Sequence, residues 1–381
     1  MRFTEFSGEW KEELLDRIAT LSKGIGIPKE QLSEDGDPCI LYGELYTKYK
    51  SEIIKQVESK TDIDGSKLKR SKANDVIIPC SGETAVDIAT ARCVPFDSIL
   101  LGGDLNVISL HKYDGAFMSY QLNGKRKYDI ARVAQGVSVV HLYGEHLKTI
   151  KTYNPTLPEQ QKIAILLSLL DERIATQNKI IEDLKKLKCA IIEKLYSKIQ
   201  GKEYSYGQLF DVVNERNKQM EYSNILSASQ EKGMVNRDDL NLDIQFERSN
   251  INTYKIVRKG DYVIHLRSFQ GGFAFSDKLG VCSPAYTILR PNSLLEYSYL
   301  SYYFTSQRFI KSLIIVTYGI RDGRSINVEE WLNMKVVIPS KEHQLHTLNV
   351  LKRIDDKVEN EEKYATCLSN QKQYLLRQMF I

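Results

Sequence analysis

Two long stretches of the chain share one pattern of hydrophobic and polar positions. In residues 157–199, apolar side chains recur at alternating steps of four and three, the spacing that packs one helix along another. Neither glycine nor proline interrupts residues 159–199, so the pattern predicts a single helix of about 60 Å at a rise of ~1.5 Å per residue. The predicted seam comprises Ile163, Leu167, Leu170, Ile174, Gln177, Ile181, Leu184, Lys188, Ile191 and Leu195.

The same seam returns 184 residues later, at the C-terminal end of the sequence. Its members are Thr347, Leu351, Ile354, Val358, Glu361, Ala365, Leu368, Lys372, Leu375 and Met379. A polar interruption of the seam is also repeated, because Lys188 and Lys372 occupy equivalent positions. Pro155 and Pro339 precede the two helices at the same offset. One globular unit cannot cover the whole apolar stripe of so long a helix, so burial of helix against helix is expected. The chain is interpreted as a tandem duplication that carries its own helical pair.

The segments in front of the two helices repeat in outline and differ in their loops. Residues 75–78 resemble 261–264, residues 93–95 resemble 282–284, and residues 117–120 resemble 299–302, at offsets that drift between 182 and 189. Insertions and deletions in surface loops produce such drift. The repeat therefore predicts two heads with one framework and different binding surfaces.

Local patterns in the first head predict several elements. Residues 39–49 are rich in aromatic and β-branched side chains and predict a strand with a turn at Gly43. Residues 52–58 have a helical pattern, and residues 116–123 predict a short helix that ends at Gly124.

The predicted fold is mixed α/β (α+β), with two globular heads separated by two long antiparallel helices in an intramolecular coiled coil. The expected boundaries are 1–154 for the first head, 155–200 for the first helix, 201–338 for the second head and 339–381 for the second helix. Antiparallel helices would relate the heads by a pseudo-twofold axis, the symmetry of proteins that read two separated half-sites on DNA. A parallel pair is less favourable, because the second head would have to span the length of the helices.

Composition narrows the class of protein only slightly. Hydrophobic residues make up 42% and charged residues 27% of the chain, as in ordinary globular proteins. No apolar run approaches the length of a membrane span and the N-terminus lacks a signal-peptide pattern, so a cytoplasmic protein is expected. The net charge of +4 suits a nucleic-acid surface and equally suits a balanced solvated surface. The six scattered cysteines predict reduced thiols.

Motifs for catalysis are missing from the sequence. There is no Asn or Asp followed by Pro-Pro and an aromatic residue, the tetrapeptide of amino-methyltransferases, and no phosphate-binding GxxxxGK[ST] loop. His343 and His346 lie three residues apart, but neither a cysteine nor a suitably placed carboxylate joins them. We therefore predict no catalytic residue and no metal site.

Almost the whole chain resembles one family. Residues 157–174 with 186–195, and residues 338–358 with 370–380, look like the two conserved helical regions of type I restriction-modification specificity (S) subunits. Residues 6–24 and 42–49 are similar to the first target recognition domain of that family. The second half of the chain departs from the family pattern in two places. His343 stands where the first half has Glu159, and the second head has no counterpart of Trp10.

The resemblance implies a non-catalytic DNA-specificity subunit. Each target recognition domain would read one half of a bipartite, asymmetric site in double-stranded DNA, and the helices would set the spacer. Two methyltransferase (M) subunits would dock around the helices and carry S-adenosylmethionine, so this chain would hold no cofactor, and a restriction and motor (R) subunit would complete the complex. The alternative is a coiled-coil scaffold that binds only protein. A fused enzyme is opposed by the missing methyltransferase motif.

Candidate DNA contacts are long polar side chains next to glycines, because base edges are read from loops that approach closely. In the first head they are Tyr46, Lys48, Ser81, Lys125, Arg126, Lys127, Gln135 and Ser138; in the second they are Arg267, Ser268, Gln270, Arg321 and Arg324. The basic run at 125–127 could equally be a solvated turn, and Tyr46 is more often a core strand residue in such a pattern. Lys188 and Lys372 could fix the register of the helices or extend toward solvent.

Overall fold

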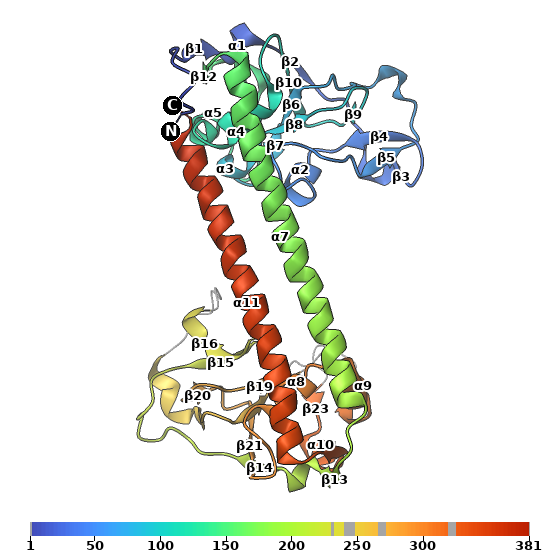
Figure 1. Cartoon of the computed structure of the whole chain (residues 1–381), viewed down its shortest axis with the longest axis vertical. Helices are drawn as coiled ribbons and strands as arrows, with labels where there is room; N and C mark the ends of the chain where they lie inside the picture. The colour runs from blue at the N-terminus through green and yellow to red at the C-terminus, as the bar shows by residue number, and fades with distance from the viewer. Residues whose placement is uncertain (1, 230–231, 240–247, 266–271, 319–324, 381) are drawn as a thin grey trace. The chain divides into compact units, whose positions relative to one another are not determined.

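The computed structural model describes residues 2–229, 232–239, 248–265, 272–318 and 325–380. The chain divides into two compact units, of which the first comprises Met1–Lys179 and Glu362–Ile381 and the second Ile180–Glu361. Each unit contains one head with part of α7 (Leu157–Ser197) and part of α11 (Lys341–Gln378) (Figure 1). Each long helix therefore contributes to both units.

Short elements make up the first head. Its strands are β1 (Lys11–Leu14), β2 (Ala19–Lys23), β3 (Leu32–Ser33), β4 (Asp37–Ile40), β5 (Ser59–Thr61), β6 (Asp75–Pro79), β7 (Ser81–Gly82), β8 (Arg92–Val94), β9 (Leu100–Leu101), β10 (Leu105–Leu110), β11 (Val140–His141) and β12 (Lys151–Asn154). Its helices are α1 (Leu15–Ile18), η1 (Lys29–Gln31), α2 (Glu44–Thr47), η2 (Gly65–Lys67), α3 (Ala85–Ile88), α4 (Gly115–Asn123), α5 (Lys127–Val133) and α6 (Gly144–Lys148).

A four-stranded antiparallel sheet in the order β2-β10-β6-β8 forms the centre of the first head. Successive side chains of β6 point to opposite faces, and both faces are covered. Val76 and Ile78 pack with Met118 of α4, whereas Ile77 packs with Leu101 on the other side. A second sheet, β3-β5-β4-β9, extends the head, and the ribbon of β1 and β12 leads into α7.

The second head is built from a similar set of elements. Its strands are β13 (Lys202–Ser205), β14 (Phe210–Val213), β15 (Leu226–Ser229), β16 (Gly233–Asn236), β17 (Lys255–Val257), β18 (Tyr262–Ile264), β19 (Phe273–Phe275), β20 (Gly280–Cys282), β21 (Thr287–Pro291), β22 (Thr317–Tyr318), β23 (Ser325–Ile326) and β24 (Lys335–Ile338). Its helices are η3 (Tyr206–Gln208), η4 (Arg237–Asp239), η5 (Arg248–Thr253), α8 (Tyr299–Tyr303), α9 (Gln307–Ser312), η6 (Leu313–Val316) and α10 (Val328–Asn333).

The predicted repeat is confirmed in the topology of the heads. The sheet β14-β21-β18-β19 of the second head matches β2-β10-β6-β8 of the first, and the ribbon of β13 and β24 matches that of β1 and β12. The cores differ in composition, because aromatic rings fill the second one. Trp331 is fully buried and stacks on Tyr206 with ring centroids 4.2 Å apart. The framework is therefore shared although the packing is not.

Within each unit the two long helices run antiparallel. In the first unit Asp171 pairs with Lys372 and Arg173 donates to the hydroxyl of Tyr364, so later residues of α7 meet earlier residues of α11. In the second unit Lys188 pairs with Asp355. All twenty seam positions of the two helices are buried or half-buried, as a continuous helix-to-helix contact requires.

Two local predictions for the first head are wrong and one is confirmed. The strand β4 ends at Ile40, and α2 follows where the sequence predicted a strand. Residues 52–58 are not helical, because the amide of Ile54 donates to Cys93 O (3.0 Å) and the amide of Cys93 donates to Glu52 O (2.8 Å). These bonds extend the edge of the central sheet. The helix α4 ends before Gly124 as predicted.

Candidate nucleic-acid interface

Three predicted DNA contacts of the first head lie on one cleft of about 750 Å³. Tyr46 reaches it from α2, Ser81 from β7 and Ser138 from the loop before β11. The hydroxyl of Tyr46 donates to Ser81 O at 3.2 Å, and burial is the main cause that raises the pKa of Tyr46. Lys50, which the sequence analysis missed, also lines the cleft and is exposed. The cleft therefore combines aromatic, hydroxyl and cationic groups.

A tight hairpin holds Ser138 at this cleft. Its base is closed by two backbone bonds between Gln135 and His141, at 2.9 and 2.7 Å, and His141 pairs with β7. Gly136 has φ +125°, and a Cβ atom there would lie 2.0 Å from Val139 O, so only glycine permits the turn. Gln135 and Ser138 are both exposed. The hairpin thus presents two predicted contacts from a fixed backbone.

Lys48 lies apart from this cleft. Its ammonium group is 2.7 Å from Glu44 Oε1 and donates to Ser59 Oγ at 2.6 Å. The bond to Glu44 is the main cause that raises the pKa of Lys48. Both acceptors are buried, so the cation stabilises the fold of the first head.

The basic residues Lys125, Arg126 and Lys127 lie at the turn between α4 and α5 and do not line the cleft. Arg126 is 5.1 Å from the ring centroid of Tyr153 and 3.2 Å from Asp129 Oδ2. Lys125 is exposed and Lys127 half-buried. Of the three side chains, Arg126 is thus committed to contacts within the head.

The predicted contacts of the second head, Arg267, Ser268, Gln270, Arg321 and Arg324, lie outside the described residues. The flanking strands are described. β18 pairs with β19 on either side of residues 266–271, and β22 pairs with β23 on either side of residues 319–324.

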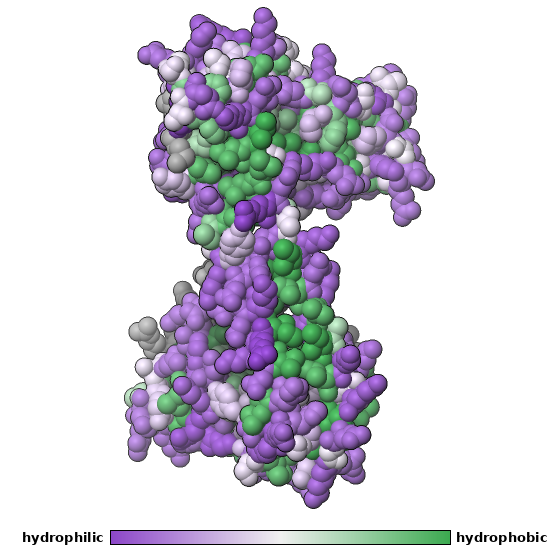
Figure 2. Space-filling model, viewed as in Figure 1, coloured by the Kyte–Doolittle hydropathy of each residue, from purple (hydrophilic) through white to green (hydrophobic). Residues whose placement is uncertain are grey.

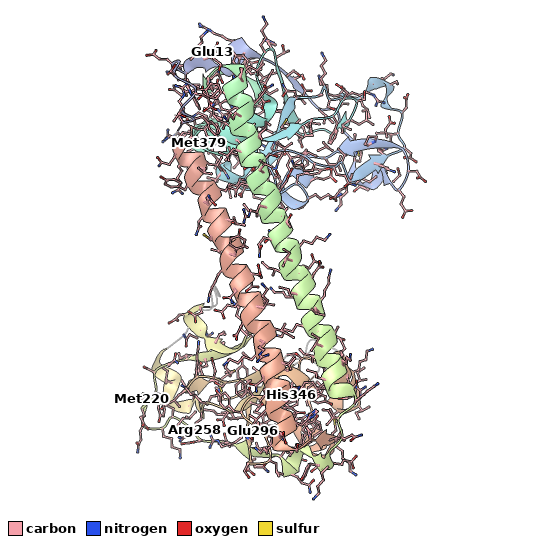
Figure 3. All side chains as sticks on the ribbon, viewed as in Figure 1. Glu13, Met220, Arg258, Glu296, His346 and Met379 are labelled. Carbon is pink, nitrogen blue, oxygen red and sulfur yellow. The ribbon has the colours of Figure 1, made fainter. Side chains whose placement is uncertain are left out.

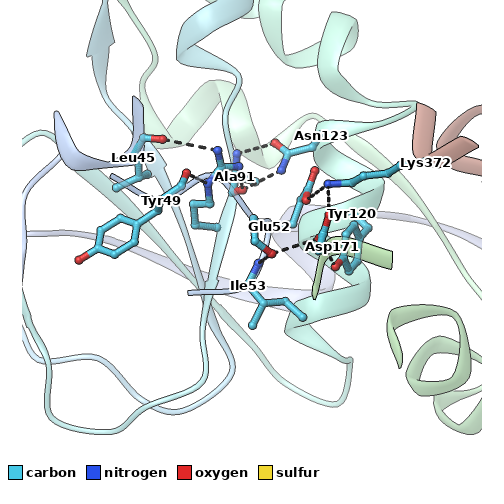
Figure 4. Close-up of polar contacts among 11 residues, drawn as sticks. Leu45, Tyr49, Glu52, Ile53, Ala91, Tyr120, Asn123, Asp171 and Lys372 are labelled. Atoms are coloured by element: carbon cyan, nitrogen blue, oxygen red, sulfur yellow. Dashed lines mark hydrogen bonds and ion pairs between the residues drawn. The ribbon is translucent and has the colours of Figure 1, made fainter. Parts of the chain in front are cut away.

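A buried ionic cluster joins the first head to both long helices, and the sequence analysis had singled out only its lysine, Lys372 (Figure 4). The ammonium of Lys372 on α11 is 2.6 Å from Asp171 Oδ1 on α7 and 2.5 Å from Glu52 Oε2 of the head. Tyr120 of α4 donates to Asp171 Oδ2 at 2.7 Å. Burial, the largest cause, raises the pKa of Glu52, while Lys372 acts to lower it. Glu52, Tyr120, Asp171 and Lys372 are called the first cluster below.

The second unit repeats three members of this arrangement. Tyr302 of α8 donates to Asp355 Oδ2 of α11 at 2.6 Å, and Asp355 pairs with Lys188 of α7. Lys188 is 5.3 Å from the ring centroid of Tyr302, close to the 5.7 Å of the first cluster. The aspartates and the lysines are each 184 positions apart, an offset that the sequence shows. Lys188, Tyr302 and Asp355 are called the second cluster below.

The two long helices also begin alike. Gln160 donates to the carbonyl of the proline five residues earlier at 2.8 Å, and Gln344 does so at 3.0 Å. The side-chain oxygen of Gln344 accepts the amide of Glu296 at 2.7 Å, and Figure 3 shows Glu296 at this end of α11. Gln160 accepts the amide of Asp114 in the same way, at 2.9 Å. Each glutamine therefore ties the start of a long helix to its own head.

The departure at His343 has a structural reason. Glu159 is completely buried and pairs with Arg2 through two hydrogen bonds of 2.7 Å. His343, at the equivalent position, is exposed, and its amide donates to Ser340 Oγ at 3.3 Å. Glu159 thus anchors the N-terminal segment through Arg2, whereas the side chain of His343 lies exposed.

The described residues were compatible with neither a metal site nor a membrane span. They contain no group of three or more His, Cys, Asp and Glu side chains that could hold a metal ion. None of the helices within the described ranges combines the length and hydropathy that a membrane span needs.

Known proteins resemble this chain in sequence and in fold. Residues 8–186 match the family model of the type I restriction modification DNA specificity domain. The specificity subunit of the type I restriction enzyme MjaVIII from Methanocaldococcus jannaschii is 25% identical over 324 residues, 76% of this chain and 74% of that protein.

Solved structures share the fold. The S subunit of a type I restriction-modification system from M. genitalium superposes with a TM-score of 0.56 at 17% identity, covering 100% of this chain and 99% of that one. A chain from work on complex assembly and conformational transition of the type I R-M system gives 0.62 at 14% identity, with 97% of each chain covered. These matches confirm the resemblance inferred from the two helical segments and the fold class.

Proposed function

We propose that this chain, whose residues 8–186 belong to the type I restriction modification DNA specificity domain family, selects the DNA sequence on which a restriction-modification complex acts. Each head would read one half of a bipartite, asymmetric site, and the paired helices would set the spacer between the halves. The chain itself would be non-catalytic, and S-adenosylmethionine would be bound by partner methyltransferase subunits.

One observation carries this proposal: the two heads share a sheet topology while their candidate reading loops differ. β2-β10-β6-β8 and β14-β21-β18-β19 have the same strand order, whereas the segments that carry the candidate contacts differ in sequence between the two heads. A repeated scaffold with different surface loops suits two half-sites of different sequence. A purely structural scaffold would not require that difference.

Methylation mapping of a genome that expresses this chain with its methyltransferase partner tests the proposal. The expected result is a split motif with a fixed, unspecified spacer. The purified complex should then bind the mapped duplex with an affinity that falls steeply with salt, because several phosphate contacts release counterions. If the complex preferred no bipartite duplex, the coiled-coil scaffold that binds only protein would be supported instead.

The hairpin of the first head gives a local test. Substituting Gln135→Ala and Ser138→Ala should reduce discrimination at the first half-site by about 1–3 kcal/mol, roughly 5- to 150-fold, because base contacts would be lost. The slope of affinity against salt should stay unchanged, since neither residue neutralises a phosphate. Discrimination at the second half-site serves as the internal control. An equal loss of affinity for all duplexes would contradict a role in reading bases.

Docking of the methyltransferase subunits has a candidate surface on α7. Ile165 and Leu169, one helical turn apart, are 61% and 58% exposed in the first unit. Figure 2 shows hydrophobic residues gathered over the early part of α7. Contiguous exposed apolar side chains of this kind mark protein interaction sites.

Replacing Ile165 and Leu169 with aspartate should weaken binding of the methyltransferase subunit by at least about tenfold, since buried apolar anchors each contribute about 1–2 kcal/mol or more. Analytical ultracentrifugation of the purified subunits measures the effect. The matched control places aspartate at Ala175 and Asn178, two other exposed positions of α7. Equal affinities for the two variants would exclude this surface.

A further inference from the structure

The two clusters differ by one carboxylate. In the first cluster, Glu52 is the third ionic member, and its carboxylate lies 2.5 Å from Lys372. The segment that carries it closes the cluster from solvent, and the side chains of Lys372 and Asp171 are only 12% and 7% exposed. In the second cluster, Asp355 is the sole carboxylate paired with Lys188 among the described residues. Nothing in that part of the chain takes the place of Glu52.

The second cluster instead opens into a cleft of about 710 Å³ in the second unit. Lys188, Tyr302 and Asp355 line this cleft together with Phe275, Tyr297 and Lys352. The side chains of Lys188 and Asp355 are 29% and 37% exposed, about twofold and fivefold more than their counterparts in the first cluster. The place that Glu52 fills in one unit is therefore accessible from solvent in the other.

We propose that this cleft binds an acidic segment of a partner protein, whose carboxylate pairs with Lys188 as Glu52 pairs with Lys372. The inference goes beyond DNA recognition, because it assigns a protein-binding site to the second unit. It is carried by the internal repeat: the chain itself shows which chemical group completes a Tyr-Asp-Lys cluster of this geometry.

Charge and shape around the cleft suit such a segment. Among the described residues that line it are three lysines, Lys188, Lys232 and Lys352, and two aspartates, Asp277 and Asp355, so this described lining is net positive toward an added carboxylate. Lys232 and Lys352 are exposed, and neither makes an ion pair within the described part of the chain.

Aromatic rings supply an apolar side for the residues that flank the carboxylate. Tyr297 is 56% exposed and lies edge-on to Phe275, with centroids 5.1 Å apart. In the first unit, Ile53, the residue after Glu52, packs in the hydrophobic cluster that contains Trp10 and Phe117. A segment in which an acidic residue precedes an aliphatic one therefore matches the cleft.

The probe is a blocked tetrapeptide, acetyl-Ser-Glu-Ile-Ile-amide, which copies residues 51–54. Its affinity for the full chain is measured by saturation-transfer NMR and compared with that of the glutamine version, acetyl-Ser-Gln-Ile-Ile-amide. The glutamate peptide should bind at least fivefold more tightly. The substitution Lys352→Glu should remove this preference, whereas the control Lys311→Glu, at an exposed position of α9 outside the cleft, should preserve it. A second variant, Lys188→Met, should also abolish the preference.

Equal affinities for the two peptides would overturn the proposal. A second outcome would also overturn it: the peptide does not bind, but a short duplex of random sequence binds and loses that binding with Lys352→Glu. The cleft would then contact the DNA backbone. The assay contains neither the target duplex nor a methyltransferase. Its failure would thus leave the half-site proposal intact, and a failure of methylation mapping would leave the peptide result standing.

Discussion

Replacing Lys372 with methionine should lower the free energy of unfolding of the first unit by about 3–5 kcal/mol, because breaking a buried ionic network leaves uncompensated charges. The substitution would leave Glu52 and Asp171 facing each other with their side chains 9% and 7% exposed. Tyr120 and Ser51 would still donate to Asp171, but two hydroxyls cannot compensate for a lost ammonium group. The first head should loosen from the helices before the rest of the chain unfolds.

The second cluster provides the matched control. Lys188→Met removes the equivalent ammonium, but Asp355 is 37% exposed and can be solvated, so the expected cost is only about 0–1 kcal/mol. Urea unfolding followed by circular dichroism gives the two changes, and hydrogen exchange in α4 and α8 shows which unit has been affected. Equal costs for the two substitutions would refute the argument that burial makes the first cluster the stronger one.

Deleting residues 176–182 together with residues 360–366 should abolish binding to the original target and create a preference for a shorter spacer. These residues lie between Asp171 and Lys188 on α7 and between Asp355 and Lys372 on α11, so both clusters are retained. A seven-residue deletion preserves the phase of the seam and shortens a helix by about 10 Å. At ~3.4 Å per base pair, the favoured spacer should become about three base pairs shorter.

A series of duplexes that differ only in spacer length measures this shift. The control deletes residues 176–182 alone, which leaves helices of unequal length and should abolish binding to every member of the series. If the double deletion kept its original spacer preference, the helices would not act as the ruler that we propose.

The long helices and the repeat could be predicted because their signals are local and periodic. Each seam position needs only a neighbour on the other helix, so the spacing of Leu167, Ile174 and Leu184 carries the information within one stretch of sequence. The glycine-terminated helix α4 was predictable for the same reason. Both depend on the preferences of neighbouring residues rather than on distant contacts.

Elements decided by distant contacts were not predictable. Residues 52–58 have helical spacing, but the backbone around Ile53 is held by Cys93, about forty positions later in the chain. The residues around Tyr46 have the composition of a strand, but Tyr46 lies in α2 and its hydroxyl donates to Ser81 O. In both cases a tertiary partner overrides the local pattern.

The candidate site was predictable only as a set of residue types. Glycines and polar side chains identified Ser81, Gln135 and Ser138, but their proximity comes from the pairing of β7 with β11. Lys48 satisfied the same criteria and instead neutralises Glu44. Asp171 and Asp355 are separated by the repeat offset in the sequence. That offset indicates two ion-pair clusters only once the structure shows which lysines pair with the aspartates.

The discontinuity of the first unit has a consequence for how the protein is made. Residues 180–361 form a contiguous unit, whereas the first unit needs residues 362–381, which are translated after the whole of the second unit. Until Lys372 has been synthesised, Asp171 and Glu52 have no cation between them, although every other residue of the first head already exists. The half of the protein that is translated first is therefore the half that is completed last.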